Sequence, residues 1–340
     1  MKLRGIDFGH VWDASGSRGF FGEGYRYQKV YGSIGMKPRH EGTFISKTAT
    51  IQPNEGNMPL APDGFSPRDW KPKCIKVYPT RCATLNAVGL SNPGLKFLLD
   101  TGKWQSRKDP FMISFMPISE KEQNRIRETR EFVALLESRI DDDSWAGDFG
   151  IQLNLRCPNR KLDSASLVNE AMVLLSLVAS LEIPVILKFD STLDVEAALQ
   201  LSRHPHCDAI SISNAVKWRD VPLEVRSEQF GTAEISPLEQ YGGGALSGRP
   251  ILPLTMNWLD RAKHIRFGCP IAIGGGIMMP EDAEWIIRSH DQIQAIELGT
   301  VRMLRPWRYD SIYDHAYNIF TRSGRRSLRP PDNPIHAVPA

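Results

Sequence analysis

Short runs of apolar residues alternate along the chain with longer segments in which apolar side chains recur every three or four positions. The short runs predict β-strands. We expect these strands at 43–50, 110–117, 149–157, 184–190, 207–214, 270–274 and 294–300, with an eighth that ends at Ala14, Ser15 and Gly16. The longer segments predict amphipathic helices. Their expected ranges are 94–101, 119–141, 163–181, 193–203, 254–267, 280–289 and 306–321.

Eight strands that are mostly followed by helices are typical of an α/β fold, the (β/α)₈ TIM barrel with a closed parallel sheet. An open doubly wound sheet is the alternative, but the G-x-G-x-x-G fingerprint after an early strand is missing. Two long segments, 52–82 and 217–250, show no clear periodicity and predict functional loop insertions at the C-terminal face. We expect one barrel domain over 1–322 and a basic, proline-containing tail over 323–340.

Composition narrows the class of protein. Of the 340 residues, 41% are hydrophobic and 24% are charged, as in an ordinary soluble globular protein. The net charge of +3 is too small to indicate a nucleic-acid partner. The five cysteines include no C-x-x-C pair, so we expect neither a disulfide framework nor a metal or iron–sulfur site in this chain. Without an apolar signal core or a run of about 18 apolar residues, we expect a cytoplasmic protein that does not bind membranes.

Polar side chains gather where the predicted strands end, which is where barrel enzymes place their chemistry. These residues are Lys47, Thr48, Asn86, Asn154, Cys157, Asn159, Lys188 and Asn214. Carboxamides both donate and accept hydrogen bonds, and a lysine inside an apolar strand needs an anion or a dipole beside it. The set holds no obvious acid and predicts a pocket for an anionic, amide-rich ligand. Structural interpretations also exist: Lys188 pairs with a buried Asp, each Asn caps a turn, and Cys157 is a buried thiol.

Glycines at the ends of the last two strands predict a phosphate site. Gly274, Gly275 and Gly276 precede a predicted helix, and Gly299 with Thr300 ends the final strand. Glycines let backbone N–H groups approach a phosphate, and the loops after strands seven and eight are the usual phosphate site of such barrels. Tight turns would also need these glycines. The segment from Gly244 to Gly248 either closes over a cofactor or forms a flexible lid.

In chain order, these motifs resemble the dihydroorotate dehydrogenase family of FMN-dependent (β/α)₈ barrels. The resemblance covers roughly residues 5–310, and its most specific part is Asn154-Leu155-Arg156-Cys157-Pro158-Asn159. The other matching motifs are Ala14-Ser15-Gly16, Ser46-Lys47-Thr48-Ala49-Thr50, Glu55-Gly56-Asn57, Asn86-Ala87-Val88-Gly89-Leu90, Lys188, Asn214, Gly244 to Gly248, Gly274-Gly275-Gly276-Ile277 and Gly299-Thr300.

The resemblance implies oxidation of dihydroorotate to orotate in pyrimidine biosynthesis, with hydride passing to flavin N5. Cys157 would take the substrate's C5 proton, and Lys188 would stabilise negative charge on the reduced ring. Substrate would be held by Lys47, Asn86, Asn154, Asn159 and Asn214. FMN would be held by Ala14, Ser15, Gly16, Lys47, Thr48, Asn154, Lys188, Gly244, Gly248, Gly275, Gly276, Gly299 and Thr300, with its phosphate on the last four.

A cysteine at the base position resembles the soluble, cytosolic class of this family. One type in that class works as a homodimer and passes electrons to fumarate. The other type pairs with an iron–sulfur, FAD-carrying subunit and uses NAD. The resemblance is compatible with either type, because the electron acceptor is recognised outside the matching motifs.

Several positions depart from the family pattern. They are Arg160-Lys161-Leu162-Asp163 in the flap, Ala215 after Asn214, the long segment 57–82 and Gly244-Ala245 near the lid. These changes touch the substrate side more than the phosphate side, so a related FMN enzyme acting on another cyclic amide is an alternative. A phosphate-binding barrel isomerase or aldolase is a second alternative, and a non-catalytic flavin-binding or scaffold protein is a third.

Overall fold

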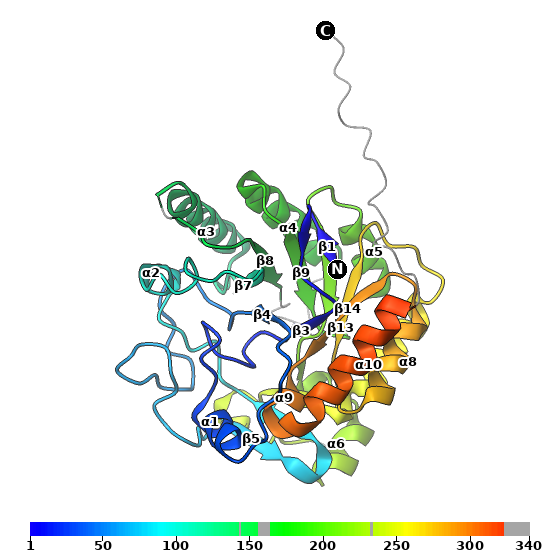
Figure 1. The fold of residues 1–340 in the computed structure, drawn as a ribbon. Helices are drawn as coiled ribbons and strands as arrows, with labels where there is room; N and C mark the ends of the chain where they lie inside the picture. The colour runs from blue at the N-terminus through cyan, green and yellow to red at the C-terminus, as the bar shows by residue number, and fades with distance from the viewer. Residues whose placement is uncertain (143, 156–163, 232–233, 323–340) are drawn as a thin grey trace.

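Eight parallel strands close into a barrel in the computed structural model, which describes residues 1–142, 144–155, 164–231 and 234–322 (Figure 1). In chain order the barrel strands are β3 (Val11–Asp13), β4 (Thr43–Ile45), β7 (Phe111–Phe115), β8 (Phe149–Asn154), β9 (Val185–Phe189), β10 (Ala209–Ile212), β13 (Ile271–Gly274) and β14 (Ile293–Leu298). The barrel closes where β14 pairs with β3. All eight predicted strands are therefore confirmed, and the open doubly wound sheet is wrong.

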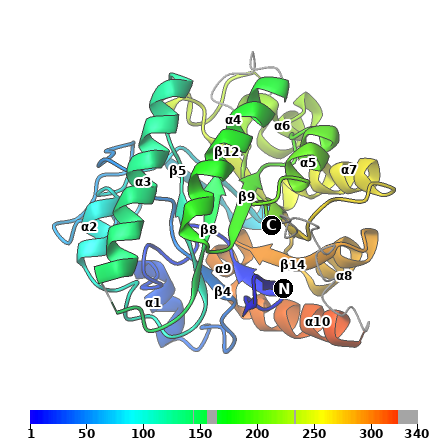
Figure 2. The same ribbon diagram turned by 90° about the horizontal axis from the view of Figure 1, so that it is seen from above.

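Helices surround this barrel on its outer side, as the view along the barrel shows (Figure 2). They are α2 (Leu95–Asp100), α3 (Glu122–Asp142), α4 (Ser164–Val178), α5 (Val195–Ser202), α7 (Leu252–Ala262), α8 (Pro280–Ser289) and α10 (Tyr309–Arg322). Each matches a predicted helix. Three further helices lie outside the predicted ranges: α1 (Arg26–Ser33), α6 (Leu223–Phe230) and α9 (Thr300–Leu304). No described helix is long and apolar enough to cross a membrane.

The inside of the barrel changes from apolar to polar along the strands. Seven strands each contribute one residue to an apolar cluster at the base: Trp12, Ile45, Met112, Ile186, Ala209, Ala272 and Ala295. An N-terminal hairpin of β1 (Lys2–Leu3) and β2 (Ile6–Asp7) packs against this cluster through Leu3 and Phe8. Because side chains on one face of a strand recur every second residue, the next inward positions lie above this base. Those positions hold Ala14, Lys47, Ser114, Lys188, Ser211, Gly274 and Glu297.

Strands within and next to the two segments predicted as irregular insertions belong to one small sheet. They form a four-stranded antiparallel sheet of β5 (Ile75–Tyr78), β6 (Ala83–Asn86), β11 (Val216–Lys217) and β12 (Ala245–Gly248), in the order β11-β12-β6-β5. This small sheet has a hydrophobic core that includes Leu85, Trp218 and Leu246. Short 3-10 turns connect several elements, at Pro79–Arg81, Ala179–Leu181, Trp218–Asp220, Glu239–Tyr241, Arg249–Ile251 and Pro306–Arg308. The prediction of structureless loops over 52–82 and 217–250 is thus wrong in part.

A buried ionic cluster joins the first and last barrel strands to the outer helices. The side chain of Asp13, at the end of β3, is fully buried. Its carboxylate accepts hydrogen bonds from Arg302 Nη1 at 3.1 Å, Arg18 Nη1 at 3.1 Å and Tyr309 Oη at 2.7 Å. Arg302 belongs to α9 and Tyr309 begins α10, so one carboxylate holds three elements. The cluster fixes the loop that begins at Ala14 relative to α9.

We expect Asp13→Asn to lower the free energy of unfolding by about 3 kcal/mol, because Arg302 would lose the counter-charge it has in the interior. Urea unfolding followed by circular dichroism measures this change. Asp260→Asn on the exposed side of α7 is the matched control and should change stability by less than about 0.5 kcal/mol. Equal stability of Asp13→Asn and the wild type would show that the cluster does not brace the fold.

Candidate active site

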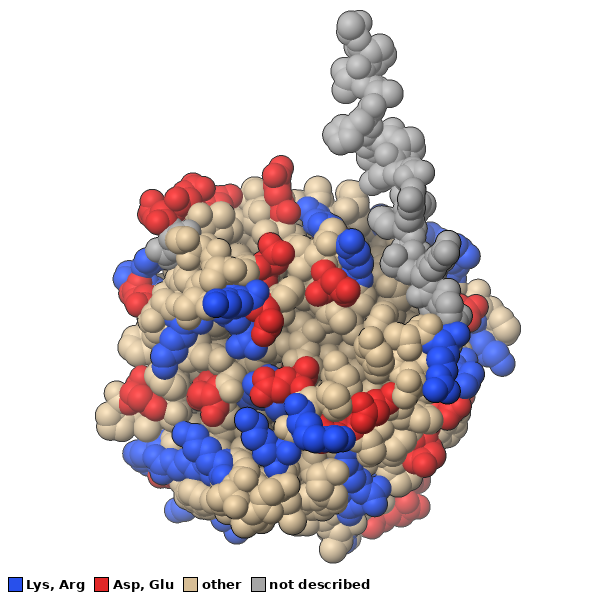
Figure 3. Space-filling view, in the orientation of Figure 1, with Lys and Arg blue, Asp and Glu red and all other residues tan. Residues whose placement is uncertain are grey.

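A cavity of about 1410 Å³ opens at the carboxyl ends of the barrel strands. Its wall combines residues from the strand ends, from the small antiparallel sheet and from α1. Basic side chains gather over the part of the surface that holds α1 and β5 (Figure 3). The outer lining of the cavity there includes Arg26, Lys29, Lys71, Lys73 and Lys76. A rim of this charge attracts an anionic ligand.

Most of the predicted site residues lie in this wall. They are Ala14, Ser15, Gly16, Lys47, Thr48, Asn86, Asn154, Lys188, Asn214, Gly275, Gly276, Gly299 and Thr300. Gly244 and Gly248 instead flank the wall residues Ala245 and Ser247 on β12. Gly248 has a φ of +97°, and a Cβ there would clash with the Cys82 carbonyl oxygen, so its role is the close pairing of β12 with β6. Cys157 and Asn159 lie outside the described residues, as do Arg160 to Asp163 and the tail 323–340.

A chain of hydrogen bonds orients the polar residues near the ends of five barrel strands. Asn214 Nδ2 donates to Asn154 Oδ1 at 2.7 Å, and Asn154 Nδ2 donates to Thr48 Oγ1 at 3.4 Å. Thr48 Oγ1 also lies 3.1 Å from Ser15 Oγ and 2.9 Å from Ser114 Oγ. Asn86 comes from β6 of the small sheet, where its Nδ2 donates to the Ala245 carbonyl oxygen at 3.4 Å. The carboxamides are therefore held in place before any ligand binds.

Lys47 is buried where the chain leaves β4. Its Nζ donates to the Ser91 carbonyl oxygen at 2.6 Å and lies 4.9 Å from the centre of the Phe20 ring. Burial lowers the pKa of Lys47 to about 8, because the ammonium group is desolvated there. A carboxylate bound beside it would restore a full positive charge. The residue is suited to hold an anionic substrate.

Lys188 is paired with an acid that the sequence prediction missed. Its Nζ lies 3.1 Å from Glu297 Oε2, and both side chains are buried. The expectation that the set has no acid is wrong, because Glu297 also lines the cavity. The structural interpretation of Lys188 as the partner of a buried acid is confirmed, but the acid is Glu297 and not an Asp. The available signal was a charged residue two positions before Gly299 in a mainly apolar strand.

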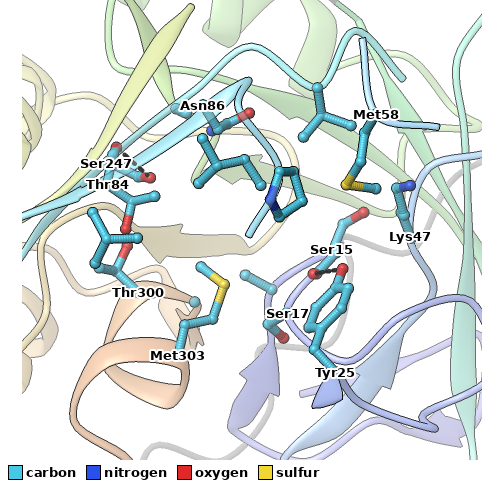
Figure 4. A pocket seen from close by; sticks show the side chains of 18 of the residues that line it. Ser15, Ser17, Tyr25, Lys47, Met58, Thr84, Asn86, Ser247, Thr300 and Met303 are labelled. Atoms are coloured by element: carbon cyan, nitrogen blue, oxygen red, sulfur yellow. Dashed lines mark hydrogen bonds between the residues drawn. The ribbon is translucent and has the colours of Figure 1, made fainter. Parts of the chain in front are cut away.

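One end of the cavity combines glycines with hydroxyl groups. Gly275 and Gly276 have φ values of +98° and +93°, and a Cβ on Gly276 would lie 2.6 Å from the Leu252 Cβ. Thr84, Ser247 and Thr300 lie together at this end, whereas Lys47 and Met58 lie at the other (Figure 4). The backbone can approach a phosphate closely where glycine leaves room, and hydroxyl groups supply further donors.

Two buried hydroxyl groups in the wall make no hydrogen bond within the described part of the chain. They are Thr84 Oγ1, on β6, and Ser17 Oγ, after β3. Buried polar atoms are normally paired, so the hydrogen-bonding capacity of these two hydroxyl groups is unused. Sequence patterns missed both, and Thr84 carried no signal because the strand β6 that presents it was not predicted.

The fold and the cavity define the class of protein. It is a (β/α)₈ barrel whose cavity has glycines and hydroxyl groups at one end and buried lysine and carboxamide side chains elsewhere in its wall.

Comparison with known proteins agrees with the resemblance of the motifs. No model of a known protein family matches the chain. The catalytic subunit of dihydroorotate dehydrogenase B (NAD(+)) from Desulforudis audaxviator is 25% identical over 326 residues, which cover 94% of this chain and 91% of that protein. The corresponding protein of Thermodesulfovibrio yellowstonii is 24% identical over 323 residues, which cover 90% of this chain and 88% of that protein.

Solved structures share the fold. Dihydroorotate dehydrogenase (DHODH) from Eimeria tenella in complex with ferulenol has a TM-score of 0.63 at 19% identity and covers 95% of this chain and 84% of its own. The ligand-free type of the same enzyme has a TM-score of 0.65 at 18% identity, and the match covers 95% of this chain and 88% of that one. Over most of its length the chain is thus similar to dihydroorotate dehydrogenases, as its motifs predict, and the family of these enzymes is flavin-dependent.

Proposed function

We propose that the protein oxidises dihydroorotate to orotate in pyrimidine biosynthesis, with FMN as its cofactor. One observation carries this proposal: Lys47, Asn154, Asn214 and Lys188 converge at one cavity whose far end is lined by glycines and hydroxyl groups. The family relationship of the chain supports the reaction. A phosphate-binding isomerase or aldolase is disfavoured by the same set, because such enzymes do not need paired carboxamides beside a buried lysine.

The cavity residues fit FMN. Gly275, Gly276, Gly299 and Thr300 would hold its phosphate, and the unpaired hydroxyl groups of Thr84 and Ser17 offer further contacts. Ala14, Ser15, Gly16 and Thr48 would line the middle of the molecule, with Asn154 and Lys188 beside the ring. Bound there, FMN supplies the acceptor for a hydride.

The chain's own residues would bind the substrate and move one proton. Lys47 would pair with the dihydroorotate carboxylate, and Asn86, Asn154, Asn159 and Asn214 would match the donors and acceptors of the ring amides. Oxidation removes a hydride from C6 and a proton from C5. Cys157, three residues after Asn154 in the sequence, would accept that proton as the general base.

We further propose that the chain forms a homodimer in the cytoplasm. The relatives are named as NAD(+)-linked catalytic subunits. Those names favour an iron–sulfur, FAD-carrying partner subunit that delivers electrons to NAD over direct transfer to fumarate.

Anaerobic mixing of the purified, flavin-loaded protein with dihydroorotate tests the reaction. We expect the flavin absorbance to bleach as hydride is transferred. Bound flavin that does not bleach would point to another cyclic amide as substrate. A purified protein without flavin absorbance, even after incubation with FMN, would instead favour the isomerase or aldolase.

We expect Cys157→Ala to keep FMN bound but to slow this bleaching by about 10²-fold or more, because the C5 proton loses its acceptor. Stopped-flow absorbance measures the rate. Cys207→Ala is the control, since the Cys207 thiol is buried 3.9 Å from that of Cys269 and does not line the cavity. Unchanged bleaching in Cys157→Ala would rule out Cys157 as the base.

Lys47 should make product binding depend on pH. Its lowered pKa of about 8 means that the ammonium charge is present below pH 8 and is lost as the pH rises through this value. The dissociation constant of orotate should therefore increase about tenfold between pH 7 and pH 9. Titration of the flavin spectrum with orotate measures it. Lys47→Arg stays charged throughout, so its dissociation constant for orotate should hardly change between pH 7 and pH 9. A wild-type dissociation constant that does not change with pH would exclude Lys47 as the partner of the carboxylate.

A further inference from the structure

The interior layer directly beneath the cavity contains one buried ion pair, between Lys188 of β9 and Glu297 of β14 in the described part of the barrel. The relative exposure is 3% for Lys188 and 2% for Glu297. Both residues nevertheless line the cavity, so the pair forms part of the floor on which a bound ring would lie.

Neighbouring strands fix the orientation of the Glu297 carboxylate. Its Oε1 accepts hydrogen bonds from Gln152 Nε2 at 3.2 Å and from the Ser211 hydroxyl. Its Oε2 is then directed to Lys188 Nζ. The two neutral donors hold the carboxylate in position without offsetting its charge. The only cation that this carboxylate contacts within the described residues is therefore Lys188.

We propose that Glu297 lowers the reduction potential of the bound flavin by partly cancelling the positive charge of Lys188. This inference rests on the proposed flavin-dependent function and assigns a role to a residue that its motifs did not include. A flavin ring gains negative charge on reduction, and a nearby ammonium group stabilises that charge. A carboxylate 3.1 Å from the ammonium opposes this stabilisation, and the opposition is strong because the interior screens charges weakly.

The pair also explains how a lysine is accommodated in the barrel interior. An isolated ammonium in the barrel interior would be costly, and the carboxylate compensates for it. Glu297 therefore acts as a positioning residue as well as an electrostatic one. A purely structural role would change stability or flavin affinity without moving the potential in a defined direction.

Redox titration of the flavin-loaded protein against a reference dye tests the proposal without substrate. Glu297→Gln keeps the shape and an acceptor oxygen but removes the charge. We expect its potential to rise, with the equilibrium between flavin and dye shifting by on the order of tenfold toward reduced flavin. Ser211→Ala removes one hydrogen bond to the same carboxylate without changing charge, and this control should shift the equilibrium much less.

A second pair of variants shows whether Glu297 acts through Lys188. Lys188→Met should lower the potential. Glu297 then has no ammonium charge left to cancel. Adding Glu297→Gln to Lys188→Met should therefore have little further effect. If Glu297→Gln fails to fold, Glu297→Asp, which withdraws the charge by one methylene, should raise the potential by a smaller amount.

Two results would overturn the inference while leaving the proposed function intact. One is a Glu297→Gln protein that binds flavin with an unchanged or lower potential. The other is a full-sized effect of Glu297→Gln in the Lys188→Met background. A wild-type protein that cannot bind flavin would instead overturn the proposed function.

Discussion

Closure of the sheet is the constraint on which the rest of this molecule depends. A closed barrel has no free edge, so each strand must place every second side chain in a common interior of fixed width. Near the hairpin this interior is filled by Trp12, Met112 and Ile186. Two residues further along the same strands, the filling is Ser114 and Lys188. The polar floor of the cavity is thus the continuation of the hydrophobic core.

This arrangement places charged side chains in an interior from which water is excluded. Neighbouring groups stabilise each of these charges. Asp13 is surrounded by two arginines and a tyrosine at the joint between the first and last strands. Lys188 and Glu297 compensate for one another across the interior. Lys47 has only a carbonyl oxygen as its hydrogen-bond acceptor among the described residues, and burial lowers its pKa because the ammonium group is desolvated. The site therefore has one lysine with its charge balanced in advance and another whose charge is completed by a ligand.

Features set by local pattern could be predicted from the sequence, whereas features set by distant pairing could not. The barrel strands are short and mainly apolar, and residues such as Asn154 and Asn214 lie at or just after their ends. Both the strands and these residues could therefore be predicted. The strands β5, β6, β11 and β12 are short and gain their order only from each other. Thr84 was missed for that reason. Glu297 was overlooked because it lies inside an apolar strand, where its partner is 109 positions away.

The pairing of β6 with β12 links Asn86 to Ala245, and therefore joins parts of the chain that are far apart in sequence. Contacts of such large separation form late, since much of the intervening chain has to be organised first. During synthesis, most of the barrel strands leave the ribosome before β12 does. One wall of the cavity is consequently missing until the chain is nearly complete.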